Sequence, residues 1–481
     1  MGWRSSRHQH TTAPTVSSRT AFNYDATTLR LYTRSKIESI FKTFAPQLDS
    51  KQYIASAAIF PMRVNNYVLE NLIDWAVVPN DPIFKLVFPQ PEMLSADHLQ
   101  TMLAILSRPE SSRVQVRNTA EQIRGTLNAH PARQKEENVP KMDGKPVSGL
   151  QHKYRETVLF FPMEGQFCHS YCTYCFRWAQ FTSVGSTQQF KSSDTQLLPD
   201  YISRYPQVSD ILLTGGDPIV MSAAVLAKYI RPLLDSSKTA HLKTIRIGTK
   251  SLGYWPMRYT SDADAKDLLK LFDDVHKAGK QVSIQAHVSH PRELQTRVAR
   301  EAVRLIRMTG AQIRSQAPLI RHVNDSADLW RDMWREQVAL GIVPYYMFVE
   351  RDTGPRDYFS VPFSEAYEIF TKAYQQVSGL CRTVRGPSMS YSAGKVAVLG
   401  IEEMYGQRVF VLKFLQARVP SWTSRVFFAA FDARATWFDE LKPAFGDDQF
   451  FFEKEYEELG GKSHEGSSGQ VRFREGLASR G

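Results

Sequence analysis

Three cysteines lie within eight residues in this chain, at Cys168, Cys172 and Cys175. Thiolates are ligands for both iron–sulfur clusters and zinc, so a C-x3-C-x2-C segment on one loop predicts a metal centre. The fourth cysteine, Cys381, lies far along the sequence. Four cysteines in a chain of 481 residues do not make a secreted disulfide framework, and their clustering indicates metal binding in a reducing compartment.

The number of clustered cysteines favours an iron–sulfur cluster over zinc. A [4Fe-4S] cluster held by three thiolates keeps one iron open for a small molecule. A structural zinc site needs a fourth ligand, which would have to be His169, directly beside Cys168, or the distant Cys381. Unliganded core cysteines are the third interpretation, although tightly clustered free thiols seldom serve packing alone. Zinc and core packing therefore stay open as minor alternatives.

The length of the chain exceeds that of a usual single domain, which predicts a catalytic core with extensions. Apolar residues recur at helical spacing between residues 28 and 127, and a stretch rich in proline and glycine follows up to residue 150. We expect five regions: a disordered arm (1–27), an N-terminal helical region with its connector (28–150), the core (151–385), a C-terminal extension (386–459) and a disordered tail (460–481).

Six short apolar runs alternate with amphipathic helical segments in the core. They span residues 158–161, 210–214, 244–247, 282–286, 312–316 and 343–348. Strands that recur with helices between them imply parallel βαβ units. We therefore predict an α/β fold whose core is a partial (β/α)6 TIM-type barrel, preceded by the helical region. Short strands near residues 396–401 and 409–414 make the extension a small α+β unit.

The formal charge of +11 suits anionic cofactors and a basic surface. Lysines and arginines are scattered and no nucleic-acid fold signature is present, so we expect no nucleic-acid partner. No run of about 18 uncharged apolar residues exists, so we expect no membrane partner. No apolar segment follows Met1, which favours a cytoplasmic protein, while Arg4, Arg7 and Arg19 in an acid-free start keep a mitochondrial transit peptide as the alternative.

The cysteine segment and further motifs resemble a known family. C-x3-C-x2-C with an aromatic residue before the last cysteine, here Tyr174, is typical of radical S-adenosylmethionine (SAM) enzymes. The other motifs resemble those of lysine 2,3-aminomutases in order and spacing: residues 149–154 (GLQHKY), 213–218 (LTGGDP), 246–249 (RIGT) with 255–258 (WPMR), Gln316 with 324–325 (ND), and 344–346 (PYY). The resemblance runs from residue 149 to 402 and identifies the chain as a member of the radical SAM superfamily, lysine 2,3-aminomutase family.

The resemblance implies a [4Fe-4S] cluster and SAM as cofactors. In the family, SAM binds the open iron through its amino and carboxylate groups, and reduction of the cluster cleaves it to a 5′-deoxyadenosyl radical. The cluster ligands match Cys168, Cys172 and Cys175. The turn that receives the amino group of SAM matches Gly215, Gly216 and Asp217, and further SAM contacts match His287 and Gln316. A plain turn and polar residues that fill a barrel mouth are the alternatives for these positions.

Pyridoxal phosphate is the third implied cofactor, which the family holds as a Schiff base on a lysine. That lysine matches Lys395, which ends the run 391–395 (YSAGK), a poorer run than the family's four glycines. An amine is what an imine requires, and small neighbours admit the ring. Lys153 and Tyr154 match residues at the phosphate and the ring, but a family phosphate arginine is replaced by Thr157. A solvated lysine in a turn is the alternative.

Arg177 matches the arginine that binds the substrate carboxylate in the family, a task suited to its planar fork. Lys395 and Arg177 are thus the expected catalytic residues. Two family acids that hold the ε-ammonium of lysine are replaced by Arg351 and Ser388. Arg351 would repel an ammonium group. We therefore predict a different amino-acid substrate, with an anionic or polar side chain such as that of glutamate.

The predicted function is that of a radical SAM isomerase that moves an amino group between adjacent carbons of an amino acid. Its partners would be this small-molecule substrate, an external electron donor and, in a homo-oligomer, further copies of the chain. The first alternative is a radical SAM dehydrogenase, epimerase or peptide-modifying enzyme without pyridoxal phosphate. The second is a non-catalytic iron–sulfur protein, which the intact turn at Gly215, Gly216 and Asp217 disfavours.

Overall fold

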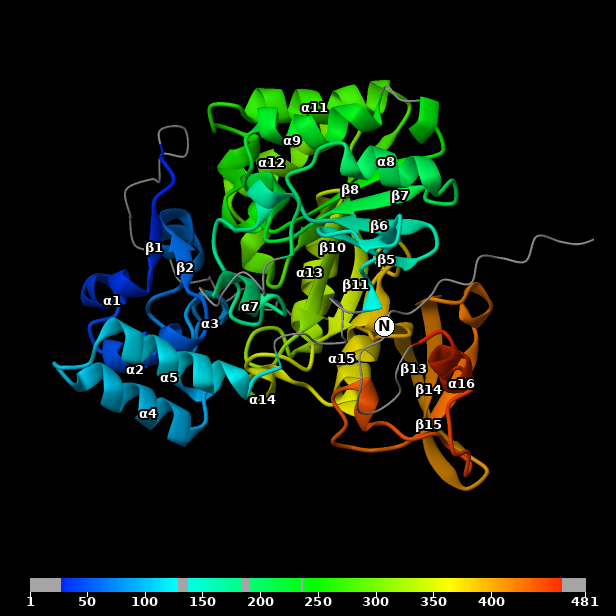
Figure 1. The fold of residues 1–481 in the computed structure, drawn as a ribbon. Helices are drawn as coiled ribbons and strands as arrows, with labels where there is room; N and C mark the ends of the chain where they lie inside the picture. Colours follow the sequence, from blue (N-terminus) through cyan, green and yellow to red (C-terminus); the bar gives the residue numbers. More distant parts are fainter. Residues whose placement is uncertain (1–26, 129–136, 183–189, 235–236, 461–481) are drawn as a thin grey trace, which may run out of the picture.

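The computed structural model describes residues 27–128, 137–182, 190–234 and 237–460 (Figure 1). The predicted arm and tail lie outside these ranges, apart from one residue at the inner end of each. Within the same ranges, we find no helix that is both long and apolar enough to cross a membrane.

Among the described residues, eleven strands form one continuous sheet, and their spatial order is their order along the chain. They are β5 (Leu150–Tyr154), β6 (Thr157–Phe160), β7 (Asp210–Leu213), β8 (Thr244–Thr249), β9 (Gln281–His287), β10 (Gln312–Leu319), β11 (Val343–Val349), β12 (Arg385–Ser390), β13 (Gly394–Met404), β14 (Gln407–Ala417) and β15 (Val426–Ala430). The strands from β6 to β12 run parallel, with antiparallel strands on both sides. The carboxyl ends of the parallel strands therefore lie along one edge, where α/β proteins place their sites.

The strands β6 to β11 coincide with the six predicted apolar runs, and the α/β fold class is confirmed. The sequence does not predict β12, because its segment RGPSMS carries glycine, proline and serine in place of an apolar run. It nevertheless pairs in parallel with β11. The sheet thus continues from the core into the C-terminal strands without a break.

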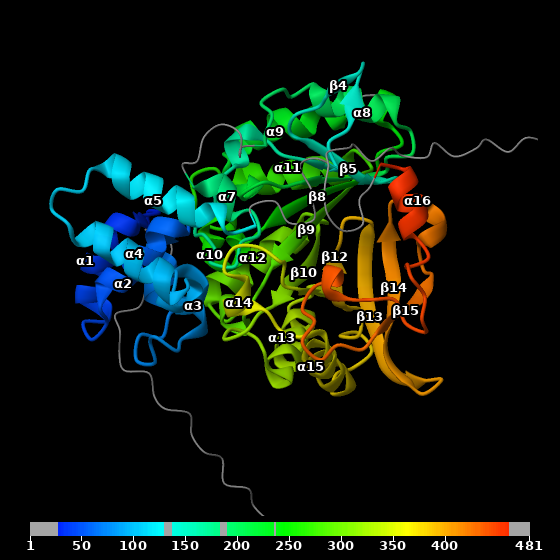
Figure 2. The ribbon, with the colours of Figure 1, turned by 60° about the horizontal axis from the view of Figure 1, so that its bottom comes forward.

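Helices connect consecutive parallel strands. They are α8 (Leu197–Arg204), α9 (Ala223–Ile230), α11 (Ala265–Lys277), α12 (Arg297–Met308), α13 (Ala327–Ala339) and α15 (Phe363–Gln375). In α12, Val298, Ala302 and Ile306 recur on one buried face, and the side chain of Thr296 caps the first turn. Burial of such faces fixes the helices on the sheet. Figures 1 and 2 show α8, α9 and α11 together on one side of β8.

The N-terminal region is helical, as predicted from its apolar spacing. It contains α1 (Ile37–Phe44), α2 (Ser50–Ile59), α3 (Pro82–Val87), α4 (Ala96–Ser107), α5 (Arg113–Gly125) and a ribbon of β1 (Leu31–Thr33) and β2 (Arg63–Asn65). A hydrophobic cluster that also includes core residues such as Tyr174 and Trp255 holds it together and joins it to the core, with Phe84 and Phe88 stacked at 4.7 Å between ring centroids. The connector forms the short pair β3 (Lys141–Met142) and β4 (Lys145–Pro146).

The C-terminal strands form the other flank of the molecule (Figures 1 and 2). β13 and β14 pair along their whole length, and an aromatic cluster that includes Phe414, Phe438 and Phe452 packs against them. Lys395 lies at the start of β13 and therefore belongs to the same sheet as the core. The short helices are α7 (Trp178–Phe181), α10 (Ser251–Tyr254), α14 (Arg356–Phe359) and α16 (Glu453–Glu458).

Candidate active site

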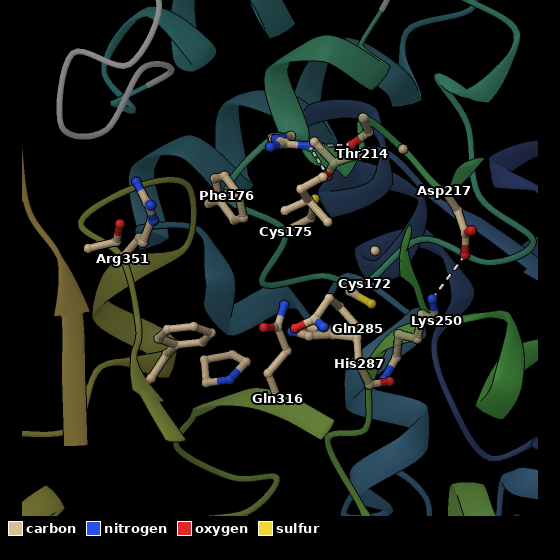
Figure 3. A pocket seen from close by; sticks show the side chains of 18 of the residues that line it. Cys172, Cys175, Phe176, Thr214, Asp217, Lys250, Gln285, His287, Gln316 and Arg351 are labelled. Atoms are coloured by element: carbon tan, nitrogen blue, oxygen red, sulfur yellow. Dashed lines mark hydrogen bonds between the residues drawn. The ribbon is translucent and has the colours of Figure 1, made fainter. Parts of the chain in front are cut away.

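A cavity of about 330 Å³ lies at the carboxyl ends of the parallel strands. It brings together residues that are up to 257 positions apart in the sequence, from Asn138 to Lys395. The predicted site residues that line it are Lys153, Tyr154, Cys168, Cys172, Cys175, Arg177, Gly215, Gly216, Asp217, His287, Gln316, Arg351 and Lys395. Ser388 is not in the wall: it is fully buried inside β12, whereas Ser390 at the end of that strand lines the cavity. Figure 3 shows part of this wall.

The three clustered cysteines lie on the loop between β6 and α7, and none of them forms a disulfide. Burial raises the pKa of all three thiols, that of Cys175 to about 12. Among the described residues, no three His, Cys, Asp or Glu side chains converge on a point where they would hold a single metal ion. Three free thiols from one loop that face one cavity do fit a cluster, because each thiolate there bonds a different iron.

The Gly-Gly-Asp turn follows β7 and packs directly on the segment before Cys168. Gly215 has a φ of 140°, and a Cβ there would lie 2.2 Å from Nε2 of Gln166. A Cβ on Gly216 would lie 2.5 Å from the backbone nitrogen of Phe167. The backbone nitrogen of Asp217 donates to the carbonyl of Phe167 at 2.9 Å. Only glycine fits in this contact, so the turn and the cysteine loop are held as one unit.

The carboxylate of Asp217 is committed to contacts within the protein. Its Oδ2 accepts from the hydroxyls of Thr249 at 2.9 Å and Ser251 at 3.0 Å, and from the backbone nitrogen of Lys250 at 2.9 Å. Burial raises the pKa of this carboxyl, and these donors oppose that shift. The side chain of Asp217 therefore fixes the turn to the end of β8.

A buried network links the cysteine loop to the ends of β8 and β9. The hydroxyl of Tyr174 contacts Nδ1 of His287 at 3.0 Å and Oγ of Ser289 at 2.8 Å. Lys250 donates to the same Oγ at 3.2 Å and pairs with Glu293 at 2.7 Å. Burial lowers the pKa of His287 to about 3, so its ring is neutral at physiological pH. His287 thus presents an uncharged imidazole beside the cysteines (Figure 3).

We expect Glu293→Gln to destabilise the fold by about 3–5 kcal/mol, because it leaves the buried ammonium of Lys250 without its counter-charge. The side chains of Lys250 and Glu293 are 8% and 0% exposed, respectively. Urea unfolding of the apoprotein measures the change. The double variant with Lys250→Met should recover most of the loss, and a single variant within about 1 kcal/mol of the parent would contradict the argument.

Lys395 is a buried amine with an altered basicity. Its Nζ lies 3.9 Å from the centre of the Tyr346 ring. Burial, helped by the cations Arg246, Arg385 and Arg351 and opposed by Tyr345, lowers its pKa to about 7. Much of the amine is therefore neutral near pH 7, which is the nucleophilic form.

Lys153 and Tyr154 lie at the same end of the cavity as Lys395. The ammonium of Lys153 donates to the carbonyl of Tyr391, in the run that leads to Lys395. Burial and the neighbouring Arg418 hold the pKa of Lys153 well below its usual range. Burial raises the pKa of Tyr154 to about 12. Thr157 is buried in β6 and is not part of the cavity wall.

Arg177 and Arg351 flank the ring of Phe176, with guanidinium carbons 5.0 and 4.6 Å from its centre. Arg177 donates through Nη1 to the carbonyl of Gly215 at 2.8 Å and to Thr214 at 3.0 Å. Nη1 of Arg351 is buried and has no hydrogen-bond partner in the described part of the chain. Burial raises the pKa of the adjacent Glu350 well above its usual range, which favours the neutral form of that carboxyl. This end of the cavity is therefore positively charged.

Several lining residues are missed by the sequence analysis. Gln285 lies two residues before His287 on β9, so strand alternation places both side chains on one face and is a signal for it. Lys250 directly follows β8 and is marked by the rule that sites gather at strand ends. Asn138 lines the cavity from the connector, where the sequence carries no signal for it.

Comparison with known proteins finds relatives that are named as L-lysine 2,3-aminomutases. A protein of Aquifex aeolicus named "Putative L-lysine 2,3-aminomutase" is 29% identical over 395 residues, which cover 82% of this chain and 91% of that protein. The L-lysine 2,3-aminomutase of Haemophilus influenzae is 24% identical over 334 residues, 69% of this chain and 83% of that one. That of Clostridium subterminale is 28% identical over 236 residues, 49% and 53% of the two chains.

The names of these relatives support the radical SAM superfamily, and within it a lysine aminomutase-like family, for this chain. No protein-family model matches it. Among solved structures, a radical SAM methyltransferase from Sphaerobacter thermophilus has a TM-score of 0.32 and 12% identity over 76% of this chain and 94% of that one, a likeness too weak to support any inference. The motifs that set this lysine aminomutase-like chain apart are those at Arg351 and Thr157, where its residues differ from the pattern of the family.

Proposed function

We propose that this chain is a radical SAM aminomutase that moves an amino group between adjacent carbons of an amino acid with an anionic side chain. The observation that carries the proposal is the shared cavity, which three free thiols, the Gly-Gly-Asp turn and the amine of Lys395 all line. We also infer that β6 to β11 and their helices form a partial (β/α)6 barrel, with the cavity at its mouth.

The cavity wall contains residues that could bind an iron–sulfur cluster, SAM and pyridoxal phosphate. Cys168, Cys172 and Cys175 would hold a [4Fe-4S] cluster, and the backbone of Gly215 and Gly216 would receive the amino group of SAM. The cluster, when bound, supplies the electron for reductive cleavage of SAM, and pyridoxal phosphate supplies an aldehyde for imine formation. An external one-electron donor is required as a partner.

Lys395 and Lys153 would bind different parts of pyridoxal phosphate. Lys395 offers a partly neutral amine for the aldehyde, and Lys153 offers an N–H donor for the phosphate. Asn138 lines this cavity as well, and its Oδ1 accepts a hydrogen bond from Arg418. Thr157 stands where the family has an arginine that binds the phosphate, so Lys153 would be a main donor to the phosphate in this chain.

The two arginines favour a substrate with two carboxylates. Arg177 would hold the α-carboxylate and Arg351 the side-chain carboxylate, since a guanidinium fork binds carboxylate bidentately. The unpartnered Nη1 of Arg351 has a hydrogen bond to give. Burial raises the pKa of Glu350 well above its usual range, which weakens this carboxyl as a counter-charge for an ammonium group. A lysine side chain in this place would meet two cations.

We expect the reconstituted enzyme to prefer L-glutamate over L-lysine by a factor of about 100 in kcat/KM, because a like-charge contact costs about 3 kcal/mol. Anaerobic turnover with SAM, pyridoxal phosphate and dithionite, read by chromatography of the β-amino acid, measures it. Arg351→Glu should reverse the preference, and Arg351→Lys should retain it at a lower rate. Preferential turnover of lysine by the parent enzyme would refute the proposed substrate.

A further inference from the structure

The N-terminal region is built into the cysteine loop. The backbone nitrogen of Tyr171 donates to the carbonyl of Arg63 in β2 at 2.8 Å, and that of Thr173 donates to the carbonyl of Leu86 in α3 at 2.9 Å. The amide of Asn65 donates to the carbonyl of His169 at 3.2 Å. The loop that carries the three thiols is therefore braced on one side by a region that precedes the core.

Arg63 brings a cation to this contact. Its Nη1 lies 3.4 Å from the carbonyl oxygen of Cys168. Its guanidinium carbon lies 5.5 Å from the centre of the Phe167 ring and 4.9 Å from that of Tyr171, so it packs between the two aromatic residues that flank Cys168 in sequence. Its Nε is buried and has no hydrogen-bond partner among the residues described by the structure.

No ion pair with an acid balances this cation within the described part of the chain. The ion pairs of the described residues include none with Arg63, whereas Lys250 on the other side of the cavity pairs with Glu293. An unpaired charge in a half-buried place acts more strongly on its surroundings than a paired one. Because Arg63 contacts the carbonyl of Cys168, its charge would act on the iron–sulfur cluster that Cys168 would hold.

A cluster with three thiolate ligands gains one negative charge when it accepts one electron. A fixed cation beside one ligand stabilises the more negative, reduced state, and net charge and hydrogen bonding are what set cluster potentials. The side chain of Arg63 also donates to the carbonyl of Cys168, a contact that helps to keep the ligand segment in place.

We propose that Arg63 is a positioning residue that raises the reduction potential of the cluster and so eases electron uptake from the donor. This inference rests on the proposed function only in requiring a cluster on the three cysteines. It assigns to the N-terminal region a part in the reaction besides covering the core.

The test is a redox titration of the reconstituted full-length holoprotein without SAM, followed by electron paramagnetic resonance of the reduced cluster. Arg63→Gln should bind as much iron as the parent but show a more negative midpoint potential. Arg63→Lys, which keeps the charge, should lie closer to the parent. The matched control is Arg117→Gln on helix α5, an exposed arginine that pairs with Glu121, and it should leave the potential unchanged.

A potential of Arg63→Gln equal to that of the parent would overturn the proposal, and so would an equal shift in Arg117→Gln. If Arg63→Gln takes up no iron, Arg63→Lys decides: iron uptake with a near-parental potential supports the role of the charge, and loss of iron there too refutes it. A parent protein that binds no cluster would instead refute the proposed function, so the two failures are distinguishable.

Discussion

Replacing Cys172 with alanine is expected to abolish the iron–sulfur chromophore and to lower 5′-deoxyadenosine formation from SAM to the uncatalysed background. The three thiols come from one loop, and the remaining cysteine is buried beside Ser378 and does not line the cavity, so no substitute ligand is available among the described residues. Iron and sulfide content, the visible spectrum and chromatography of the nucleoside after anaerobic reduction with dithionite measure the loss.

Cys381→Ala is the matched control, since it removes a thiol of the same chain outside the cavity. It should retain the cluster and the nucleoside product, with a stability change of about 1 kcal/mol from the lost side-chain volume. Retained iron in Cys172→Ala, equal loss of iron in both variants, or stoichiometric zinc in oxygen-free parent protein would each be incompatible with the cluster assignment.

Lys395→Ala is expected to eliminate the absorption band of bound pyridoxal phosphate and all amino migration, while SAM cleavage under dithionite stays within a few-fold of the parent. The amine of Lys395 is the group that can join the aldehyde, and it lies on β13, which strands β7 to β12 separate in the sheet order from β6, the strand before the cysteine loop. Absorbance spectra and the two product assays on one preparation separate the effects.

The pH dependence of pyridoxal phosphate incorporation is an independent test of the role of Lys395. Because the pKa of Lys395 is lowered to about 7, its neutral form predominates above that pH. The rate of pyridoxal incorporation should therefore rise from pH 6 to 8 and then level off, whereas an ordinary lysine with a pKa of about 10.4 would give a rate that keeps rising. Lys395→Arg should give no band at any pH. A pyridoxal band in Lys395→Ala would show that another amine carries the cofactor.

The sequence reveals the core strands well and the extensions less well, for a physical reason. Strands β6 to β11 are buried on both faces and so read as apolar runs between amphipathic helices. β12 pairs with β11 on one side and with β13 on the other. This pairing and burial override the low strand preference of its glycine, proline and serine residues. β15 is likewise not predicted and pairs only with β14 in the sheet.

The candidate site is predictable where a motif fixes both residue type and position. The cysteines, the Gly-Gly-Asp turn and Lys395 carry their chemistry in local sequence, and the structure brings them to one cavity. The shifted pKa values of His287 and Glu350 arise from burial. The pair of Lys250 with Glu293 and the approach of Arg63 to Cys168 arise from long-range packing. These pKa shifts and contacts exist only in the folded chain, so no local sequence pattern predicts them.

The agreement between spatial and chain order has a consequence for biosynthesis. Each strand can join a neighbour that has already emerged from the ribosome, so the sheet can grow from β5 towards β15 during translation. The cysteine loop, however, is made more than two hundred residues before Lys395 closes the wall of the cavity. At about 5–20 residues per second, the nascent thiols would stay open to oxygen for roughly 10 to 40 s. Cells that make this protein in air would therefore need either protection of the nascent loop or repair by later thiol reduction.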